Sequence, residues 1–294
     1  MPLNHLTLLY RGSLSGCNYA CDYCPFAKHT DSRERLAQDK QQLERLTAWV
    51  ASQTRPISIL FTPWGEALIR GYYRQAITEL SWMPQVKKVA IQTNFSCSSQ
   101  WLEKTNKEKV AFWISYHPKE INHQQFIQRC RQLDEQSVHY SVGMVGVKEN
   151  FSYIAQCRQD LSQHQYLWIN SYKREKNYYQ PEDIKFLSQI DPHFMTNNQR
   201  YPSLGRPCHT GETVISVNGD GDISRCHFIK DKLGNIYNQP LEDILKPRLC
   251  SLKQCGCYIG YIHMPELKLK KVYGDSILER NIIPWLHQHD NLIE

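Results

Sequence analysis

Six short apolar runs alternate with longer amphipathic stretches from residue 5 to about residue 190. The runs are rich in Val, Ile, Leu and aromatic residues, as buried parallel strands are. We expect strands at residues 5–10, 57–61, 86–92, 110–115, 138–142 and 166–169. We expect helices at about residues 35–52, 72–80, 99–105, 122–133, 152–161 and 181–189. Six strand–helix units in succession predict an α/β fold with a parallel sheet and right-handed crossovers.

The pattern changes near residue 200. Residues 201–207, YPSLGRP, contain Pro and Gly and are interpreted as a linker. Two alternating runs around Asn-Gly-Asp-Gly then predict a β-hairpin over residues 213–226. A short helix is expected at residues 240–245, and a helical tail from Leu267 onward with a candidate break at Pro284. A region this small and rich in cysteine needs a staple such as a metal.

Composition narrows the class of protein. The net charge of +6 is spread along the chain without a run of five basic residues, which is typical of a solvated surface, although an anionic substrate or nucleic acid stays open. No apolar stretch reaches the roughly 18–20 residues that span a membrane, and no secretory signal is evident, so we expect a cytoplasmic protein. In that reducing compartment, the eleven cysteines favour metal ligation over disulfides.

Three of the cysteines follow the first predicted strand with the spacing C-x3-C-x2-C. These are Cys17, Cys21 and Cys24, called here the first cysteine group. Active sites of barrel-type folds gather at this edge of the sheet. Three thiolates can hold three irons of a cubane and leave the fourth iron open for chemistry. Structural zinc is the alternative, with His29 as its fourth ligand.

The spacing C-x3-C-x-aromatic-C resembles the signature of the radical S-adenosylmethionine (radical SAM) superfamily, with Tyr23 at the aromatic position. After the second predicted strand, Gly65 and Glu66 resemble part of the family's G-G-E-P motif, whereas Trp64 and Ala67 depart from it. The resemblance implies that Glu66 receives the methionine amino group. A glycine there also allows close approach of the backbone to a ligand.

Later segments resemble the family in the expected order. Asn94 ends a segment similar to T-N-G, and Ser115 stands where the family often keeps a serine for the ribose. Residues 143–149 resemble a shortened form of the family's Gly-rich adenine motif, in which Val145 would pack on the adenine. Lys148 or Lys119 would meet the methionine carboxylate. The resemblance implies a partial (β/α)6 barrel over residues 1–200 that binds S-adenosylmethionine and a [4Fe-4S] cluster.

The later cysteines resemble the SPASM/Twitch appendage of radical SAM enzymes, a small α+β domain, here residues 201–265, followed by a C-terminal tail, 266–294. The resemblance implies one auxiliary [4Fe-4S] cluster, serving as an electron conduit or a structural staple. Cys250 could replace one of the ligands, and structural zinc is again the alternative. The implied ligands, called here the second cysteine group, are Cys208, Cys226, Cys255 and Cys257.

The resemblance implies an enzyme that cleaves S-adenosylmethionine reductively to a 5′-deoxyadenosyl radical. This radical would abstract hydrogen from a peptide or a small-molecule natural product. The expected partners are that substrate, an electron donor such as flavodoxin or ferredoxin, and other biosynthetic proteins. Two alternatives stay open: a radical enzyme acting on RNA, and a non-catalytic metal-binding protein that binds nucleic acid.

Overall fold

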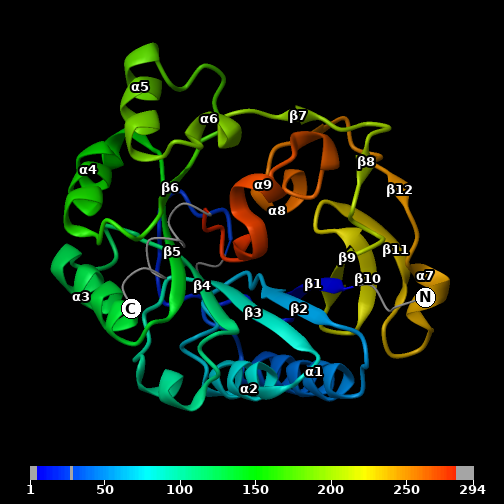
Figure 1. Cartoon of the computed structure of the whole chain (residues 1–294). Coiled ribbons are helices and arrows are strands. Elements are labelled where there is room, and N and C mark those ends of the chain that lie inside the picture. Colours follow the sequence, from blue (N-terminus) through cyan, green and yellow to red (C-terminus); the bar gives the residue numbers. More distant parts are fainter. Residues whose placement is uncertain (1–4, 27–28, 283–294) are drawn as a thin grey trace, which may run out of the picture.

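A mostly parallel sheet forms the centre of the protein (Figure 1). The computed structural model describes residues 5–26 and 29–282. The sheet has nine strands in the order β11-β10-β9-β1-β2-β3-β4-β5-β6. The six strands that come first along the chain are β1 (Leu6–Arg11), β2 (Ile57–Phe61), β3 (Val86–Thr93), β4 (Val110–Ser115), β5 (His139–Val145) and β6 (Leu167–Asn170). These six pair in parallel, one after the next, which confirms the predicted α/β class and parallel sheet.

The connections between these strands are helical, as the amphipathic stretches predict. The helix expected at residues 99–105 is instead the 3-10 helix η1 (Gln100–Lys104), a form that suits such short pieces. A second 3-10 turn, η2 (Lys148–Asn150), precedes the fourth helix. The α-helices are α1 (Arg33–Ala51), α2 (Gly71–Trp82), α3 (His123–Glu135), α4 (Phe151–Asp160), α5 (Pro181–Ile190) and the short α6 (Phe194–Asn197).

Each of the two faces of the sheet packs against its own apolar layer. Alternate strand residues such as Leu8 and Ile59 join helix residues such as Leu46 in one core. Their sequence neighbours Leu9 and Leu60 belong to a second core. Because successive side chains of a strand point to opposite faces, burial on both faces explains the near-continuous apolar runs.

The predicted hairpin is confirmed, and it extends the central sheet. β9 (Val214–Asn218) pairs in parallel with β1, with Val214 opposite Thr7. β10 (Asp222–Cys226) and β11 (Ile229–Asn235) follow in antiparallel order. The predicted short helix is also present as α7 (Leu241–Ile244).

The interpretation of residues 201–207 as a linker is wrong. This segment holds β7 (Tyr201–Pro202) and begins β8 (Pro207–Cys208). β7 pairs with β13 (Gln254–Cys255), and β8 pairs with β12 (Arg248–Leu249). The backbone of the segment is thereby tied to the last cysteines of the chain.

The segment after Cys257 occupies the inner face of the sheet (Figure 1). It contains α8 (Tyr258–Tyr261), η3 (Pro265–Leu267), α9 (Lys270–Tyr273) and η4 (Gly274–Ser276). Tyr258, Ile262 and Tyr273 pack with sheet residues Trp113 and Trp168. From Leu267 onward, the predicted helical tail is thus a series of short helices as far as residue 282. Pro284, the candidate break, lies outside the described residues. None of the helices in residues 5–26 and 29–282 has the length and apolar character needed to cross a membrane.

Candidate functional site

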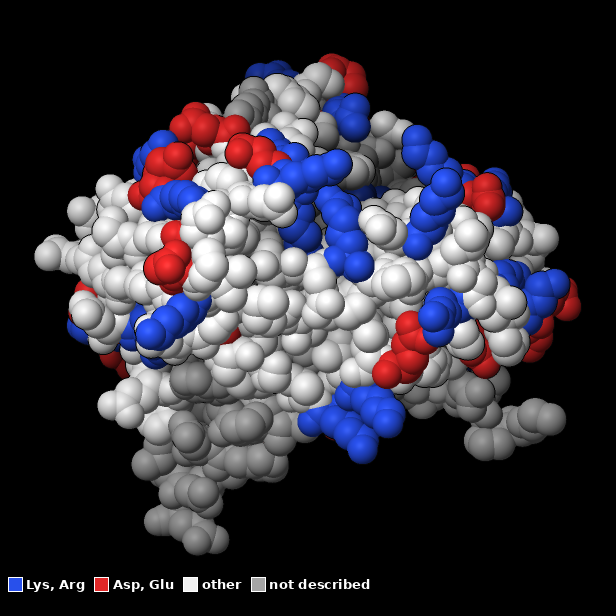
Figure 2. Space-filling view, turned by 90° about the horizontal axis from the view of Figure 1, so that it is seen from above, with Lys and Arg blue, Asp and Glu red and all other residues white. Residues whose placement is uncertain are grey.

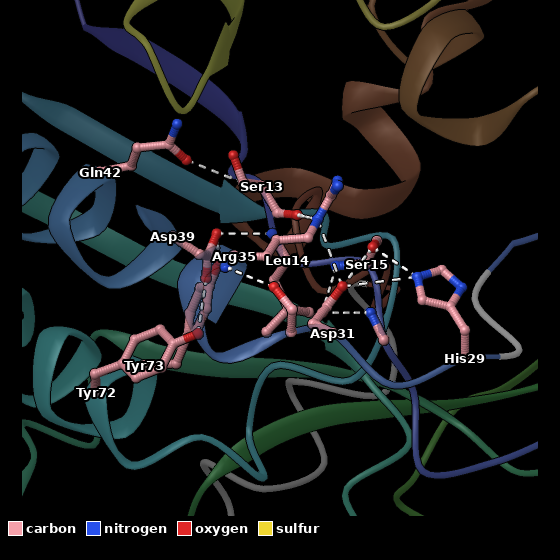
Figure 3. Close-up of polar contacts among 12 residues, drawn as sticks. Ser13, Leu14, Ser15, His29, Asp31, Arg35, Asp39, Gln42, Tyr72 and Tyr73 are labelled. Carbon is pink, nitrogen blue, oxygen red and sulfur yellow. Dashed lines mark hydrogen bonds and ion pairs between the residues drawn. The ribbon is translucent and has the colours of Figure 1, made fainter. Parts of the chain in front are cut away.

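Two buried carboxylates hold the loop that leads from β1 to Cys17 (Figure 3). One oxygen of Asp39 accepts a hydrogen bond from the backbone N–H of Leu14 at 2.8 Å. Asp31 accepts from the N–H of Ser15 at 3.0 Å and from that of Gly16 at 2.6 Å. The start of the cysteine loop is thus fixed by side chains from α1 and the turn before it.

The two carboxylates differ in their charge environment. Burial acts to raise the pKa of Asp31, but hydrogen bonds from Ser15 and Gly16 and the charge of Arg35 outweigh it, and the pKa is lowered. Burial dominates for Asp39 and raises its pKa, although Leu14 and two tyrosines donate to it. Asp31 is therefore the more firmly ionised of the two.

The thiols of the first cysteine group influence one another. Burial raises the pKa of Cys21 to about 12, and the charges of Glu120, Cys24 and Cys17 add to the effect. Burial also raises the pKa of Cys17, whose sulfur accepts from the N–H of Tyr19 at 3.4 Å. The loop therefore gathers three thiols whose ionised forms would repel one another, and a bound cation would stabilise those ionised forms.

The turn after β2 packs directly on this loop. A Cβ atom at Gly65 would lie only 1.9 Å from the carbonyl oxygen of Gly16, so no larger residue fits. The next N–H, that of Glu66, donates to the same carbonyl at 3.2 Å. The close approach at Gly65 is thus to the cysteine loop itself.

Glu66 is buried and joins the carboxyl ends of β2 and β3. Its carboxylate accepts from Thr93 Oγ1 at 2.7 Å, from Asn94 N at 2.6 Å and from Leu68 N at 2.8 Å. Burial raises its pKa despite these donors. The side-chain amide of Asn94 in turn lies 3.9 Å from Cys17 Sγ. Glu66 and Asn94 therefore lie next to the first cysteine group, as their motifs predict.

A cavity of about 630 Å³ lies beside the two cysteine groups. Ser115, Val145 and Asn170 line it, each the last residue of its strand, β4, β5 or β6. The complete lining is Tyr23, Cys24, Pro25, Phe26, Ser115, His117, Val145, Asn170, Ser171, Tyr172, Lys173, Arg174, Arg200, Phe228, Leu252, Gln254, Cys255, Gly256 and Cys257. The cavity thus joins Tyr23, Ser115 and Val145 of the predicted set to members of both cysteine groups.

Tyr23 is held in this cavity by His117. Its hydroxyl lies 2.8 Å from His117 Nδ1, and the two rings stack with centroids 5.8 Å apart. Burial lowers the pKa of His117 to about 4, so this ring is neutral at pH 7. No motif assigned a role to His117, which the structure places against Tyr23 as its hydrogen-bond and stacking partner.

The thiols of the second cysteine group lie within electrostatic reach of one another. Burial raises the pKa of Cys255 to about 12, with further contributions from the charges of Cys257, Cys226 and Cys208. Gly260 packs so closely on Cys255 that an added Cβ would lie 2.7 Å from its sulfur. That Cys208, Cys226, Cys255 and Cys257 hold a cluster stays a prediction.

Positive charge surrounds the part of the second group that faces the cavity. Desolvation by the surrounding protein atoms raises the pKa of Cys257, although the residue is exposed to solvent, while the charges of Arg280, Lys173 and Arg11 act to lower it. Lys173 Nζ donates to the carbonyl of Gly256, between the last two cysteines, at 2.6 Å. Such cations would offset the negative charge of a thiolate-bound cluster.

The two lysines considered for the methionine carboxylate have other contacts. Lys148 Nζ lies 2.9 Å from Asp183, and Lys119 Nζ lies 3.2 Å from Asp22. Neither lysine lines the cavity. No three His, Cys, Asp or Glu side chains within residues 5–26 and 29–282 converge as ligands of one metal ion.

Sequence reasoning missed the carboxylates that brace the cysteine loop and the arginines of the cavity. One signal was available for Asp39, since it lies on the same helical face as Leu43, Leu46 and Val50. A carboxylate on the core face of a helix must have buried donors. No such local signal marks Arg174 and Arg200, because only the tertiary fold brings them to the cavity.

Comparisons with known proteins give a shared fold. No protein-family model matches the chain, and no curated protein matches it. The structure described as native anSMEcpe with bound AdoMet and Cp18Cys peptide aligns with a TM-score of 0.56 and 17% identity, covering 82% of this chain and 80% of that chain. Native anSMEcpe with bound AdoMet aligns with a TM-score of 0.56 and 18% identity, covering 81% and 80%. The chain therefore shares its fold with anSMEcpe. We draw nothing from BtrN in complex with AdoMet and 2-DOIA, whose TM-score is 0.43 at 16% identity over 83% of this chain and 82% of that chain.

Proposed function

We propose that this protein is a radical SAM enzyme with an auxiliary iron–sulfur cluster. The observation that carries the proposal is the cavity that joins Cys24 of the first cysteine group, the carboxyl ends of β4 to β6, and Cys255 and Cys257 of the second. Ligand sites of parallel α/β folds lie at this edge of the sheet. A cofactor and a substrate bound there would contact both cysteine groups.

The first cysteine group would hold the [4Fe-4S] cluster that binds S-adenosylmethionine. Its three thiols lie on one loop, close enough for Cys17 and Cys24 to affect the pKa of Cys21, as ligands of one cluster would. When bound, cluster and cofactor supply reductive cleavage of S-adenosylmethionine to a 5′-deoxyadenosyl radical, which abstracts hydrogen from the substrate. The protein's own contribution is to bind, to orient and to exclude water.

Residues around the cluster have separate tasks in this proposal. Glu66 offers a buried negative charge to the methionine ammonium group. A carboxylate has about four acceptor sites. Three described donors occupy three of the acceptor sites of Glu66, which leaves about one for the ammonium group. Asn94 and Ser115 would hydrogen-bond the cofactor, while Val145 packs on the adenine and Tyr23 closes the loop side of the cavity. Lys148 is assigned no contact with the carboxylate, because it is paired with Asp183.

The second cysteine group would hold the auxiliary [4Fe-4S] cluster. Support comes from the mutual effect of its four thiols and from the cations near Cys257. With four protein ligands, the cluster serves as an electron conduit or as a staple for β7, β8, β12 and β13. The strands that carry Cys208 and Cys255 have only two residues each, so a metal staple would stabilise their pairing.

The substrate in this proposal is a peptide or a small-molecule natural product. Reduction would come from flavodoxin or ferredoxin, in the cytoplasm, and other biosynthetic proteins would supply the substrate. The test is anaerobic reconstitution with iron and sulfide, followed by dithionite and S-adenosylmethionine. Formation of 5′-deoxyadenosine is expected from the wild type, and its absence from a protein that carries both clusters would refute the proposal.

A further inference from the structure

The cavity has an excess of positive charge. Lys173, Arg174 and Arg200 line it, and no Asp or Glu of the described residues does. A second cavity of about 670 Å³ shares these three side chains and adds Lys176 and Glu175. Figure 2, which views the molecule from the side of α5, α6 and β7, shows Lys and Arg side chains around a hollow on this face. A cavity with such a lining attracts anions.

The two arginines lack a carboxylate partner within the part of the chain that the structure describes. Arg174 donates through Nη2 to the carbonyl of Tyr23 at 2.9 Å, and Arg200 donates to the carbonyl of Lys173 at 3.1 Å. A guanidinium carries five N–H donors, so each keeps donors for a ligand. By contrast, Arg206 pairs with Glu266 at 3.1 Å.

Lys173 has a different part, because its donors are already used. Its ammonium donates to Gly256 O at 2.6 Å, to Gln199 O at 3.3 Å and to Asn197 Oδ1 at 3.4 Å. Burial lowers the pKa of Lys173 to about 8, so at pH 7 it still adds a positive charge to the wall of the cavity. Direct contact with an anion therefore falls to Arg174 and Arg200.

We propose that Arg174 and Arg200 bind an oxyanion of the substrate, a carboxylate or a phosphate. This inference rests on the proposed function and adds the chemical class of the substrate. A guanidinium is a planar fork of N–H donors, and it binds two oxygens of a carboxylate or of a phosphate through paired hydrogen bonds. The substrate's anionic end lies at the arginines, and the rest of it extends along the cavity toward Ser115 and Val145.

The test uses the reconstituted holoenzyme with saturating S-adenosylmethionine, so that the carboxylate site of the cofactor is already filled. Phenyl phosphate, benzoate and neutral benzamide are titrated at constant ionic strength and followed by ligand-observed NMR. We expect one of the two anions to bind and benzamide not to bind. Preference for phenyl phosphate identifies a phosphate-bearing substrate, and preference for benzoate a carboxylate.

The variants decide which residues are responsible. Arg174→Gln and Arg200→Gln should each weaken anion binding about tenfold or more. Arg174→Lys should retain part of the affinity, because the charge persists. Arg131→Gln, on the exposed side of α3, is the matched control and should bind as the wild type does. Arg200 packs near Gly256, which lies between Cys255 and Cys257, so the iron content of every variant is measured. If Arg200→Gln loses iron, the comparison of Arg174→Gln with Arg174→Lys decides the test.

Two results would overturn the inference. One is anion binding that is absent, or unchanged in the Arg174 and Arg200 variants. The other is weaker binding of S-adenosylmethionine in these variants with unchanged anion binding, which would assign the arginines to the cofactor's carboxylate. Failure of the proposed function is distinct, since it appears as a wild type that carries both clusters and forms no 5′-deoxyadenosine with dithionite and S-adenosylmethionine.

Discussion

Replacing Glu66 by Ala and by Gln separates its structural role from its role toward the cofactor. Ala removes the acceptor of three buried donors, the N–H groups of Leu68 and Asn94 and the hydroxyl of Thr93. An unsatisfied buried donor costs about 1–3 kcal/mol, so Glu66→Ala should lower the free energy of unfolding by about 3–6 kcal/mol after relaxation. That is a large part of a typical domain's stability of about 5–15 kcal/mol.

Gln retains most of this structure but removes the charge. Leu68 N and Thr93 Oγ1 both donate to the same oxygen, Oε1, which the amide of Gln can replace. Only the N–H of Asn94 then faces an NH2 group, so the structural cost falls to about 1–3 kcal/mol. Loss of the charge-assisted contact should weaken binding of S-adenosylmethionine about 10–100-fold, with the first cluster retained.

The measurements are thermal unfolding, iron content and calorimetric titration of S-adenosylmethionine into the reconstituted proteins. Glu108→Gln is the control, because Glu108 is exposed and has no ion pair within the described residues. Equal melting temperatures for Glu66→Ala and Glu66→Gln would refute the claim that Gln keeps two of the three buried hydrogen bonds that Ala loses. A folded Glu66→Gln enzyme with unchanged affinity for S-adenosylmethionine would refute the assignment of Glu66 to the ammonium group.

Three further predictions test the two cysteine groups and the loop that connects β1 to α1. Any single Cys→Ala change in the first cysteine group should abolish 5′-deoxyadenosine formation in a folded protein; wild-type turnover would contradict this. The reconstituted wild type should hold about eight irons, and the triple Ala variant of the first group about four. Cys250→Ala should keep all of them and Cys257→Ala should not, whereas one bound zinc in the triple variant would indicate a zinc staple. Asp31→Asn should cost about 2–3 kcal/mol of stability at pH 7. Because the folded pKa of Asp31 lies below its unfolded value of about 3.9, the difference in stability should be present in full above that pH and be lost as the pH falls further, through the folded pKa. Asp231→Asn, at an exposed site, is the control, and a pH-independent difference would contradict the ionised contact.

The apolar runs were sufficient to predict the first six strands, because each is buried on both faces and its composition shows this locally. The turn Asn-Gly-Asp-Gly likewise predicted β9 and β10. Their place in the sheet could not be predicted, since the pairing of Thr7 with Val214 joins residues 207 positions apart and leaves no local pattern. The same holds for β7 and β8, whose two-residue strands form only through contact with β12 and β13.

In the candidate site, too, some contacts follow from local motifs and others depend on tertiary packing. Motif spacing predicted that Glu66 and Asn94 lie beside the first cysteine group, because loops at the carboxyl ends of neighbouring strands are adjacent. It could not predict that Lys148 pairs with Asp183, since that contact depends on where α5 packs. The C-terminal segment was also beyond prediction: its short helices are stabilised by burial against Trp113 and Trp168 rather than by their own periodicity.

The most direct test of the central claim is the yield of 5′-deoxyadenosine. The wild type, reconstituted without oxygen and given dithionite and S-adenosylmethionine, should form 5′-deoxyadenosine and methionine in equal amounts. The triple Ala variant of the first cysteine group, which should keep the second cluster, should form none. Equal yields from the two proteins, or no product from a wild type that carries both clusters, would contradict the account.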